Sequence, residues 1–405
     1  MCTTTPRDVR TRQAELHKGA GYRYGGHNIN TLEGTIHMRS LSLVGITKLY
    51  ILSKMNKRVV LTSRPGPDGV PTVDNFEVEE CPLPELTEGT VLVKTLCLSV
   101  DPYMRCRMNM DTGTDYVSPW RLDQTIDGGG VGIIVESRCR GFRRGEILES
   151  FHWPWQLYAV MELQGVNCLL VKKVDPALIE RHFSLICGLF GLNGQAAFIG
   201  IREKGHVIPE ANQTFVVSAA AGACGSLAGQ IARLQGCGLI VGICGSDQKC
   251  SFLLEELSFS HAINYKTEDV SLRIKECCPS GVDIYFDNVG GNISDSVIEQ
   301  MNEGSHIILC GQIAMYNTST PYPPPLPDDV ERTRKERNIT RDRFLVLNYT
   351  DEFSDAIAQL SEWFKEGKIK YHETVSHGLE SAPSAFLSMM SGGNIGKQIV
   401  HVAEP

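Results

Sequence analysis

From about residue 183 to residue 347, short apolar runs alternate with longer windows whose apolar residues recur three and four positions apart. The apolar runs are rich in β-branched residues and bounded by Gly, Ser or Asp, a pattern typical of buried strands. The longer windows, such as 249–259 and 294–302, are typical of amphipathic helices. The alternation predicts an α/β fold with a doubly wound parallel sheet. The predicted strands are 214–218, 239–244, 262–265, 282–287 and 306–310.

The chain from Met55 to about residue 182 shows a different pattern, with short alternating segments broken by Pro and Gly. Turn signals such as Arg64-Pro-Gly66 recur between these segments, so a β-rich, barrel-like domain is predicted over 55–182. After Arg343 we predict a strand at 344–347, an amphipathic helix at 353–366 and two short strands around a further helix. The parallel-sheet domain, 183–347, would then be inserted into the first domain, to which residues 348–405 return. The segment 312–343 reads as one long, Pro-rich loop, which is typical of functional or mobile segments.

Residues 1–54 lack these patterns and are rich in Ser, Thr, Gly and Arg. Two interpretations stay open. The segment is a disordered or spurious leader ahead of a start at Met55, or it is a mitochondrial transit peptide, against which Asp8, Glu15 and Glu33 argue. We therefore expect a cytoplasmic protein, or a mitochondrial one if the leader is a transit peptide.

Composition narrows the function classes. A net charge of −8 argues against general nucleic-acid binding, and no apolar run reaches the roughly 20 residues that span a membrane. The 14 cysteines are scattered and form no CxxC pair, so they suit a reduced interior better than a structural zinc site. A small-molecule ligand is expected, and a monomer, with a dimer left open.

The most specific chemical signal is the turn Ala220-x-Gly222-x-x-Gly225 between a predicted strand and a predicted helix. Gly222 permits a sharp turn, and Gly225 allows close packing of the helix on the strand, so that a pyrophosphate can approach the helix N-terminus. A tight contact between helix and sheet is the alternative reading. The turn predicts a dinucleotide cofactor.

The next strand indicates which dinucleotide. An NAD site usually has an acidic residue at the tip of this strand to bind the ribose 2′-hydroxyl, but this strand ends Gly242-Ile-Cys-Gly-Ser246. Lys249 follows and Tyr265 ends the third strand, which favours a 2′-phosphate and hence NADP(H). Asp247 leaves the opposite reading open, as an acid displaced by two positions.

Catalysis is predicted to need no metal. The glycine cluster Asp127-Gly-Gly-Gly130 contains neither a His nor a Cys that could bind zinc. The 11 histidines of the chain are not spaced as zinc ligands usually are. Hydride transfer then needs a dry pocket and a polarised acceptor. Tyr316, just past the fifth strand, is the candidate donor to a carbonyl oxygen, with an aromatic packing role as the alternative. Five aromatic residues are candidates for an apolar wall: Tyr103, Tyr116, Phe151, Trp153 and Trp155. The cluster Phe151-His-Trp-Pro-Trp155 equally suits a core at the interface between the domains.

Several motifs together resemble the zinc-free medium-chain reductases of the leukotriene B4 dehydrogenase type, from Met55 to the C-terminus. The motifs are Leu98-Ser-Val-Asp-Pro-Tyr-Met-Arg105, Thr112-Gly-Thr-Asp-Tyr116, Trp153-Pro-Trp155, Ala220–Gly225, Tyr285-Phe-Asp-Asn-Val-Gly-Gly-Asn292, Pro321-Tyr-Pro-Pro-Pro325, Glu336-Arg-Asn-Ile-Thr-Arg341 and Gly393-Asn-Ile-Gly-Lys397. The resemblance implies a GroES-like catalytic domain, a Rossmann domain that binds NADP(H), and reduction of the 13,14 double bond of 15-oxoprostaglandins.

The resemblance also implies roles for individual residues. The implied cofactor contacts are Gly222, Ala223, Cys224, Gly225, Lys249, Tyr265, Asn288, Cys310, Gly311, Gln312, Ile313, Ala314, Met315, Tyr316, Phe344, Leu345, Val346 and Asn394. The implied substrate contacts are Phe151, His152, Leu345, Val346 and Leu347, with Tyr316 in the active site.

The chain departs from this family at two places. The family usually has Tyr at the position of His152, and the segment 157–172 is longer than expected by several residues. A broader alkenal or quinone reductase and a non-catalytic NADPH-binding protein remain as alternative functions.

Overall fold

The computed structural model describes residues 55–163, 171–179 and 182–405. The leader 1–54 and part of the extended segment 157–172 lie outside these residues, so the predictions made for them are not addressed by the structure. Among the described residues, no helix combines the length and apolar character that a membrane crossing requires.

The first domain is built on a mixed seven-stranded sheet, in the order β14-β15-β3-β4-β5-β7, with β6 paired to β3. A separate antiparallel pair, β1 and β2, completes the strands. The bounds are β1 Met55–Leu61, β2 Phe76–Pro82, β3 Thr90–Ser99, β4 Asp127–Ser137, β5 Ile147–Pro154, β6 Tyr158–Glu162, β7 Val171–Lys173, β14 Glu373–His377 and β15 Lys397–His401. The helices of this part are α2 Met104–Arg107, α3 Pro176–Ile179 and α11 Ala382–Met390.

The glycine cluster at the start of β4 is explained by packing. A Cβ on Gly130 would lie 2.5 Å from Trp153, and one on Gly132 would lie 2.3 Å from the same ring. Trp153 and Trp155 are completely buried in the core of this domain. The two tryptophans thus pack in the core of the first domain itself, and not in an apolar cavity wall or in a core at the domain interface.

The second domain holds a six-stranded, all-parallel sheet in the order β10-β9-β8-β11-β12-β13. This is the strand order of doubly wound dinucleotide-binding sheets. The strands are β8 Thr214–Ser218, β9 Leu239–Cys244, β10 His261–Asn264, β11 Val282–Asp287, β12 Met301–Leu309 and β13 Thr340–Arg343. The helices are α4 Leu192–Lys204, α5 Ala223–Gln235, α6 Asp247–Ser251, α7 Val270–Cys277, α8 Gly291–Ile298, α9 Asp328–Glu336 and α10 Phe353–Lys365.

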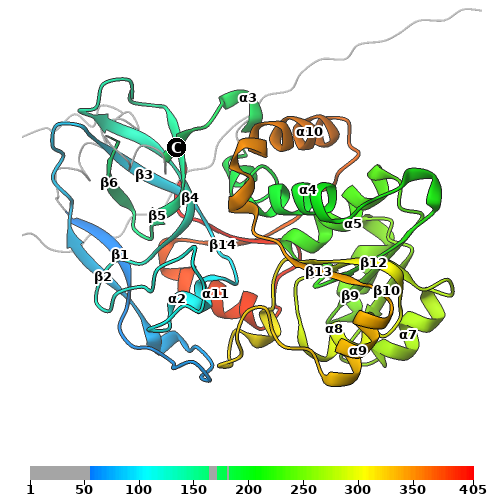
Figure 1. Cartoon of the computed structure of the whole chain (residues 1–405). Coiled ribbons are helices and arrows are strands. Elements are labelled where there is room, and N and C mark those ends of the chain that lie inside the picture. Colours follow the sequence, from blue (N-terminus) through cyan, green and yellow to red (C-terminus); the bar gives the residue numbers. More distant parts are fainter. Residues whose placement is uncertain (1–54, 164–170, 180–181) are drawn as a thin grey trace, which may run out of the picture. The chain divides into compact units, whose positions relative to one another are not determined.

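Helices cover both faces of this sheet (Figure 1). Successive side chains of a strand point to opposite faces, and β8 illustrates this: Phe215 and Val217 join the core beneath α4, α5 and α10, whereas Val216 joins the core beneath α7, α8 and α9. The predicted fold class, a β-rich domain with a parallel doubly wound domain, is confirmed.

Two sequence predictions near the end of this domain are wrong. The sixth strand is β13, Thr340–Arg343, not 344–347, and a 3₁₀ helix, Val346–Glu352, follows it. The segment 312–343 is not one loop, since it contains α9 and β13. Both elements escaped notice because they carry little apolar periodicity: α9 buries only Val330, and β13 buries no residue.

The chain rejoins the first sheet at β14. Before that, α10 packs on α4, with Ala356 and Leu360 fully buried in the core beneath these helices. β15 then pairs with β3. This pairing returns the C-terminal strand to the sheet of the first domain. The exact domain boundaries stay a prediction.

Candidate functional site

The glycine turn joins β8 to α5 as predicted. Gly222 precedes the helix in an extended conformation, and a Cβ on Gly225 would lie only 2.4 Å from the carbonyl oxygen of Ala219. The backbone therefore excludes every side chain at position 225. The first N–H groups of α5, from Ala223, Cys224 and Gly225, can reach no carbonyl of their own helix, and the first turn carries no acidic residue. These features suit an anionic group such as a pyrophosphate.

The C-terminal segment closes against this turn. Gly396 N–H donates to the carbonyl of Ala221 at 2.8 Å, and a parallel bridge joins Gly222 to Gly396. Asn394, which is nine-tenths buried, donates from Nδ2 to the carbonyl of Gly396 at 2.7 Å. Asn394 thus helps to hold the backbone of Gly396 against the glycine turn.

The tip of β9 brings Lys249 and Tyr265 to one place. Ser246 caps α6 by accepting a hydrogen bond from the Lys249 N–H at 3.2 Å, and a Cβ on Gly245 would lie 2.9 Å from the Tyr265 ring. Lys249 Nζ donates to the carbonyl of Gly392 at 2.8 Å, and burial lowers the pKa of this lysine. The ammonium is therefore held against the backbone of Gly392, in the C-terminal segment that returns to the first domain.

Asp247, the alternative acidic residue, is engaged elsewhere. Its carboxylate accepts a hydrogen bond from Asn264 Nδ2 at 2.7 Å. This contact ties α6 to the end of β10. The carboxylate thus already has a structural partner.

Asp287 joins the ends of β8 and β11 through hydrogen bonds to its carboxylate. This role was not predicted from the sequence. The fully buried carboxylate accepts hydrogen bonds from Ser218 Oγ, Tyr285 Oη and Ser294 Oγ, and from two backbone N–H groups of the following turn. Asn288, a predicted cofactor contact, donates from Nδ2 to the carbonyl of Ser218 at 2.8 Å. A glycine-rich turn after a strand was visible in the sequence, but its convergence on one carboxylate was not.

A cavity of about 300 Å³ opens beside the end of β12. Its lining includes the predicted residues Cys310, Gln312, Met315, Tyr316, Phe344 and Leu345. The predicted residues Gly311, Ile313, Ala314, Val346 and Leu347 lie on the same two segments without lining the cavity. Burial raises the pKa of Tyr316 well above its ordinary value, so its phenol stays a hydrogen-bond donor. The buried Gln312 Oε1 has no partner among the described residues and is available to an amide donor.

Three contacts between the domains surround this cavity. Arg105, whose side chain is completely buried, donates from Nε to Asn317 Oδ1 at 2.8 Å, next to Tyr316. The N–H and hydroxyl of Ser319 both donate to Asp68. The third contact is an ion pair between Arg343 and Asp115. None of these six residues was assigned a role from the sequence, because their partners are about 200 or more positions apart.

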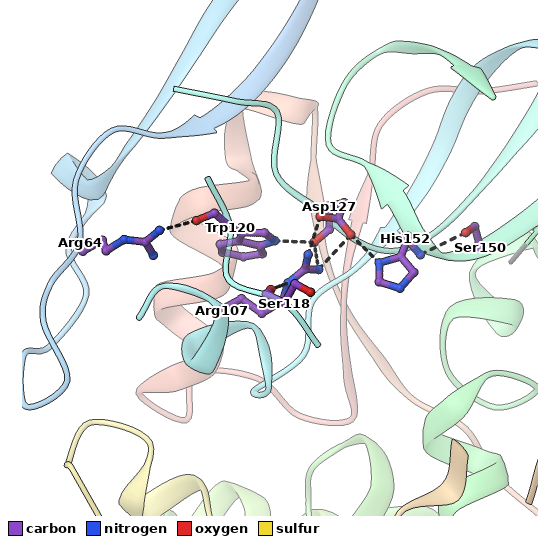
Figure 2. A network of polar contacts seen from close by, with 7 residues as sticks. All are labelled: Arg64, Arg107, Ser118, Trp120, Asp127, Ser150 and His152. Carbon is purple, nitrogen blue, oxygen red and sulfur yellow. Dashed lines mark hydrogen bonds and ion pairs between the residues drawn. The ribbon is translucent and has the colours of Figure 1, made fainter. Parts of the chain in front are cut away.

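His152, a predicted substrate contact, belongs to a separate polar network (Figure 2). Its Nδ1 donates to Asp127 Oδ2 at 2.8 Å, while Arg107 binds both carboxylate oxygens of Asp127 at 2.7 and 2.9 Å. His152 borders a second cavity of about 460 Å³, and it does not line the cavity of Tyr316. Tyr116 lines both cavities.

Phe151 packs beside this network. Its ring centroid lies 5.1 Å from that of Tyr103, which in turn contacts Tyr116. Neither Phe151 nor His152 lines the cavity that contains Leu345, whereas Thr112, Thr114 and Tyr116 line both cavities. Their role in binding substrate stays a prediction.

The Asp127 network yields a prediction about pH. Burial raises the pKa of Asp127, but hydrogen bonds from His152 and Arg107 outweigh it and hold this pKa below its ordinary value. A depressed folded-state pKa gives stability that is present above the unfolded value of about 3.9 and is lost as the pH falls through the folded value. Asp127→Asn should therefore lose about 1.5–3 kcal/mol at pH 7, and its difference from wild type should shrink as the pH falls below about 4.

Urea unfolding at pH 7 and at acidic pH measures this effect. Asp123→Asn is the matched control, because Asp123 is exposed in the turn before β4 and Asn tolerates its left-handed backbone. A variant as stable as wild type at pH 7 would contradict the assignment.

Among the described residues, no group of three or more His, Cys, Asp or Glu side chains could hold a metal ion. This finding concerns the geometry only.

Two family models match the chain. Residues 57–169 match the model described as the N-terminal domain of oxidoreductase, and residues 257–400 match the one described as zinc-binding dehydrogenase. The chain is 41% identical over 340 residues to YfmJ of Bacillus subtilis, a putative NADP-dependent oxidoreductase, with 84% of this chain and 96% of that protein covered. It is 36% identical over 338 residues to prostaglandin reductase 1 of Rattus norvegicus, with 82% and 95% covered.

A solved structure is similar to this chain over a comparable share of its length. CurA from Vibrio vulnificus in complex with NADPH superposes with a TM-score of 0.77 at 34% identity, covering 86% of this chain and 100% of that one.

Proposed function

The chain belongs to the medium-chain dehydrogenase/reductase family of NADP-dependent oxidoreductases, and we propose that it reduces the carbon–carbon double bond of α,β-unsaturated ketones, with 15-oxoprostaglandins as its substrates. The activity would be that of prostaglandin reductase 2, the 15-oxoprostaglandin 13-reductase. The observation that carries the proposal is Tyr316, a half-buried phenol in the lining of a cavity at the end of β12. The similarity to prostaglandin reductase 1 supports the substrate class.

The residues at the start of α5, at the tip of β9 and after β12 suit the parts of NADPH. The free N–H groups at the start of α5 suit the pyrophosphate, and Lys249 with Tyr265 suits the 2′-phosphate. The orphaned Gln312 Oε1 suits a carboxamide. When bound, NADPH supplies a hydride to the β-carbon of the enone.

Tyr316 then acts on the substrate oxygen. Hydride addition to the β-carbon moves electrons onto the ketone oxygen as an enolate, and a neutral phenol donating to this oxygen stabilises the developing charge. The raised pKa of Tyr316 keeps the phenol protonated. Transfer of a solvent proton to the α-carbon completes the saturated ketone.

The test is NADPH oxidation by the full chain with 15-oxoprostaglandin E2, simple alkenals and quinones. We expect the highest kcat/KM with the prostaglandin. Comparable values across the panel would favour a broader alkenal or quinone reductase. Cofactor binding without turnover on any enone would favour a non-catalytic NADPH-binding protein.

The cofactor assignment predicts a selective loss in Lys249→Met. A hydrogen bond between charged groups contributes about 1.5–3 kcal/mol, so Kd for NADPH should rise about 10- to 100-fold. Kd for NADH, which lacks the 2′-phosphate, should change little. Calorimetric titration measures both constants, and Lys275→Met is the control, since Lys275 is an exposed lysine on α7. Equal losses for the two cofactors would contradict the 2′-phosphate assignment.

A further inference from the structure

The cavity that contains Tyr316 has a single basic residue in its lining. Among the described residues around it, Arg343 is the only Lys or Arg, and it stands at the end of β13 beside Phe344 and Leu345. The rest of the lining is uncharged except for Asp111. A lone guanidinium at the edge of a small-molecule cavity is suited to a planar anion such as a carboxylate.

A carboxylate of the protein pairs with this guanidinium. Arg343 Nη2 lies 2.9 Å from Asp115 Oδ1, and the two side chains are 35% and 77% exposed. Ion pairs that are this exposed contribute little to stability and exchange readily with solutes. The pair can therefore open without disturbing either domain.

Arg343 keeps a second support when Asp115 leaves. Its guanidinium lies over the ring of Tyr322, 5.2 Å from the centroid, and Tyr322 is fixed by a hydrogen bond from its hydroxyl to the carbonyl of Leu309 at 3.1 Å. A cation held over an aromatic face retains its position at low entropic cost. The guanidinium is thus preorganised at the rim.

A second guanidinium near the cavity, that of Arg105, is not neutralised by a hydrogen-bonded carboxylate in the part of the chain that the structure describes. Arg105, behind Tyr316, donates only to amide and carbonyl oxygens, from Asn317, Asn109, Gly66, Pro67 and Gly69. No carboxylate among the described residues is hydrogen-bonded to it. The acidic groups nearby are Asp111 on the rim, Asp115 on Arg343, and Asp68, which accepts from Ser319.

We propose that Arg343 binds a carboxylate at the far end of the enone substrate, and that Asp115 holds this position until the substrate displaces it. The proposal rests on the proposed function and deepens it: the preferred substrates are enones that carry an anionic tail. Asp115 itself lines only the neighbouring cavity, and it stands between Thr114 and Tyr116, which line both cavities.

The experiment compares a 15-oxoprostaglandin with its methyl ester, which differ only in the negative charge. Wild type should have a KM for the acid about tenfold below that for the ester. Arg343→Gln should abolish this difference, Arg343→Lys should restore part of it, and Asp115→Asn should lower KM for the acid about threefold by removing the competitor. Arg332→Gln, which removes an exposed charge from α9 outside the cavity lining, is the control and should behave as wild type.

The outcomes separate the two proposals. If wild type reduces both compounds and the acid-to-ester ratio of KM is the same in Arg343→Gln, the carboxylate site is wrong and the enone reductase stands. If wild type reduces neither compound, the proposed function fails and the carboxylate site fails with it. Raised salt should weaken binding of the acid alone, and equal effects on both compounds would also overturn the proposal.

Discussion

The Tyr316→Phe variant is expected to reduce an enone about 100- to 1,000-fold more slowly than wild type, the usual cost of losing one donor to a developing oxyanion. The substitution removes a single oxygen from the lining of the cavity and leaves the aromatic ring that packs there. Since the substitution keeps the aromatic ring, which is the part of Tyr316 that would pack against the cofactor, Kd for NADPH should change little. The loss should appear in kcat, because the donor acts most strongly when the enolate charge develops.

Two matched variants make this result specific. Tyr116→Phe removes another hydroxyl from the same cavity, and Tyr322→Phe removes one whose hydrogen bond goes to the Leu309 carbonyl. Neither should lower kcat by more than about tenfold, because neither hydroxyl is assigned to the ketone oxygen. Steady-state rates at saturating NADPH measure all three. Wild-type kcat in Tyr316→Phe would remove Tyr316 from the mechanism and leave the aromatic packing role.

The parts of this molecule that could be predicted from sequence are those written in local patterns. The strand from 214 to 218, the Gly222 and Gly225 turn and the helix after it lie within about twenty consecutive residues, and each residue type has a local physical reason. Five of the six strands of the parallel sheet carry apolar runs that identify them. The sixth, β13, reads Thr-Arg-Asp-Arg and lies at the sheet edge, where no buried face imposes a pattern.

The site residues that escaped prediction depend on distant partners. Arg105 ends the motif Leu98–Arg105, but its contact with Asn317, 212 positions away, forms only in the folded chain. His152 was noted as a departure, yet the sequence did not reveal that Asp127 would hold it. Local sequence patterns can indicate candidate side chains, but contacts between side chains far apart in the sequence are known only from the folded structure.

A buried ion pair between Lys397 and Asp101 joins the C-terminal strand to the end of β3. Lys397 is 1% exposed, and its Nζ donates to Asp101 Oδ1 at 2.9 Å and to the carbonyl of Val100 at 2.6 Å. Asp101 also accepts hydrogen bonds from Ser99 and from Asn193 at the start of α4. The pair thus connects three segments that meet under the glycine turn, next to the Gly396 contact.

Lys397→Met is expected to destabilise the protein by about 3–5 kcal/mol, because it leaves the Asp101 carboxylate without its cation in a nearly water-free site. The midpoint of urea unfolding measures the loss. The double variant Lys397→Met with Asp101→Asn should recover much of it, since the remaining group is neutral and can still bond to Ser99 and Asn193. Lys368→Met, at an exposed lysine paired with Glu366, should change the midpoint little. Equal losses in the single and double variants would mean that packing of the lysine stem, rather than an unpaired charge, accounts for the effect.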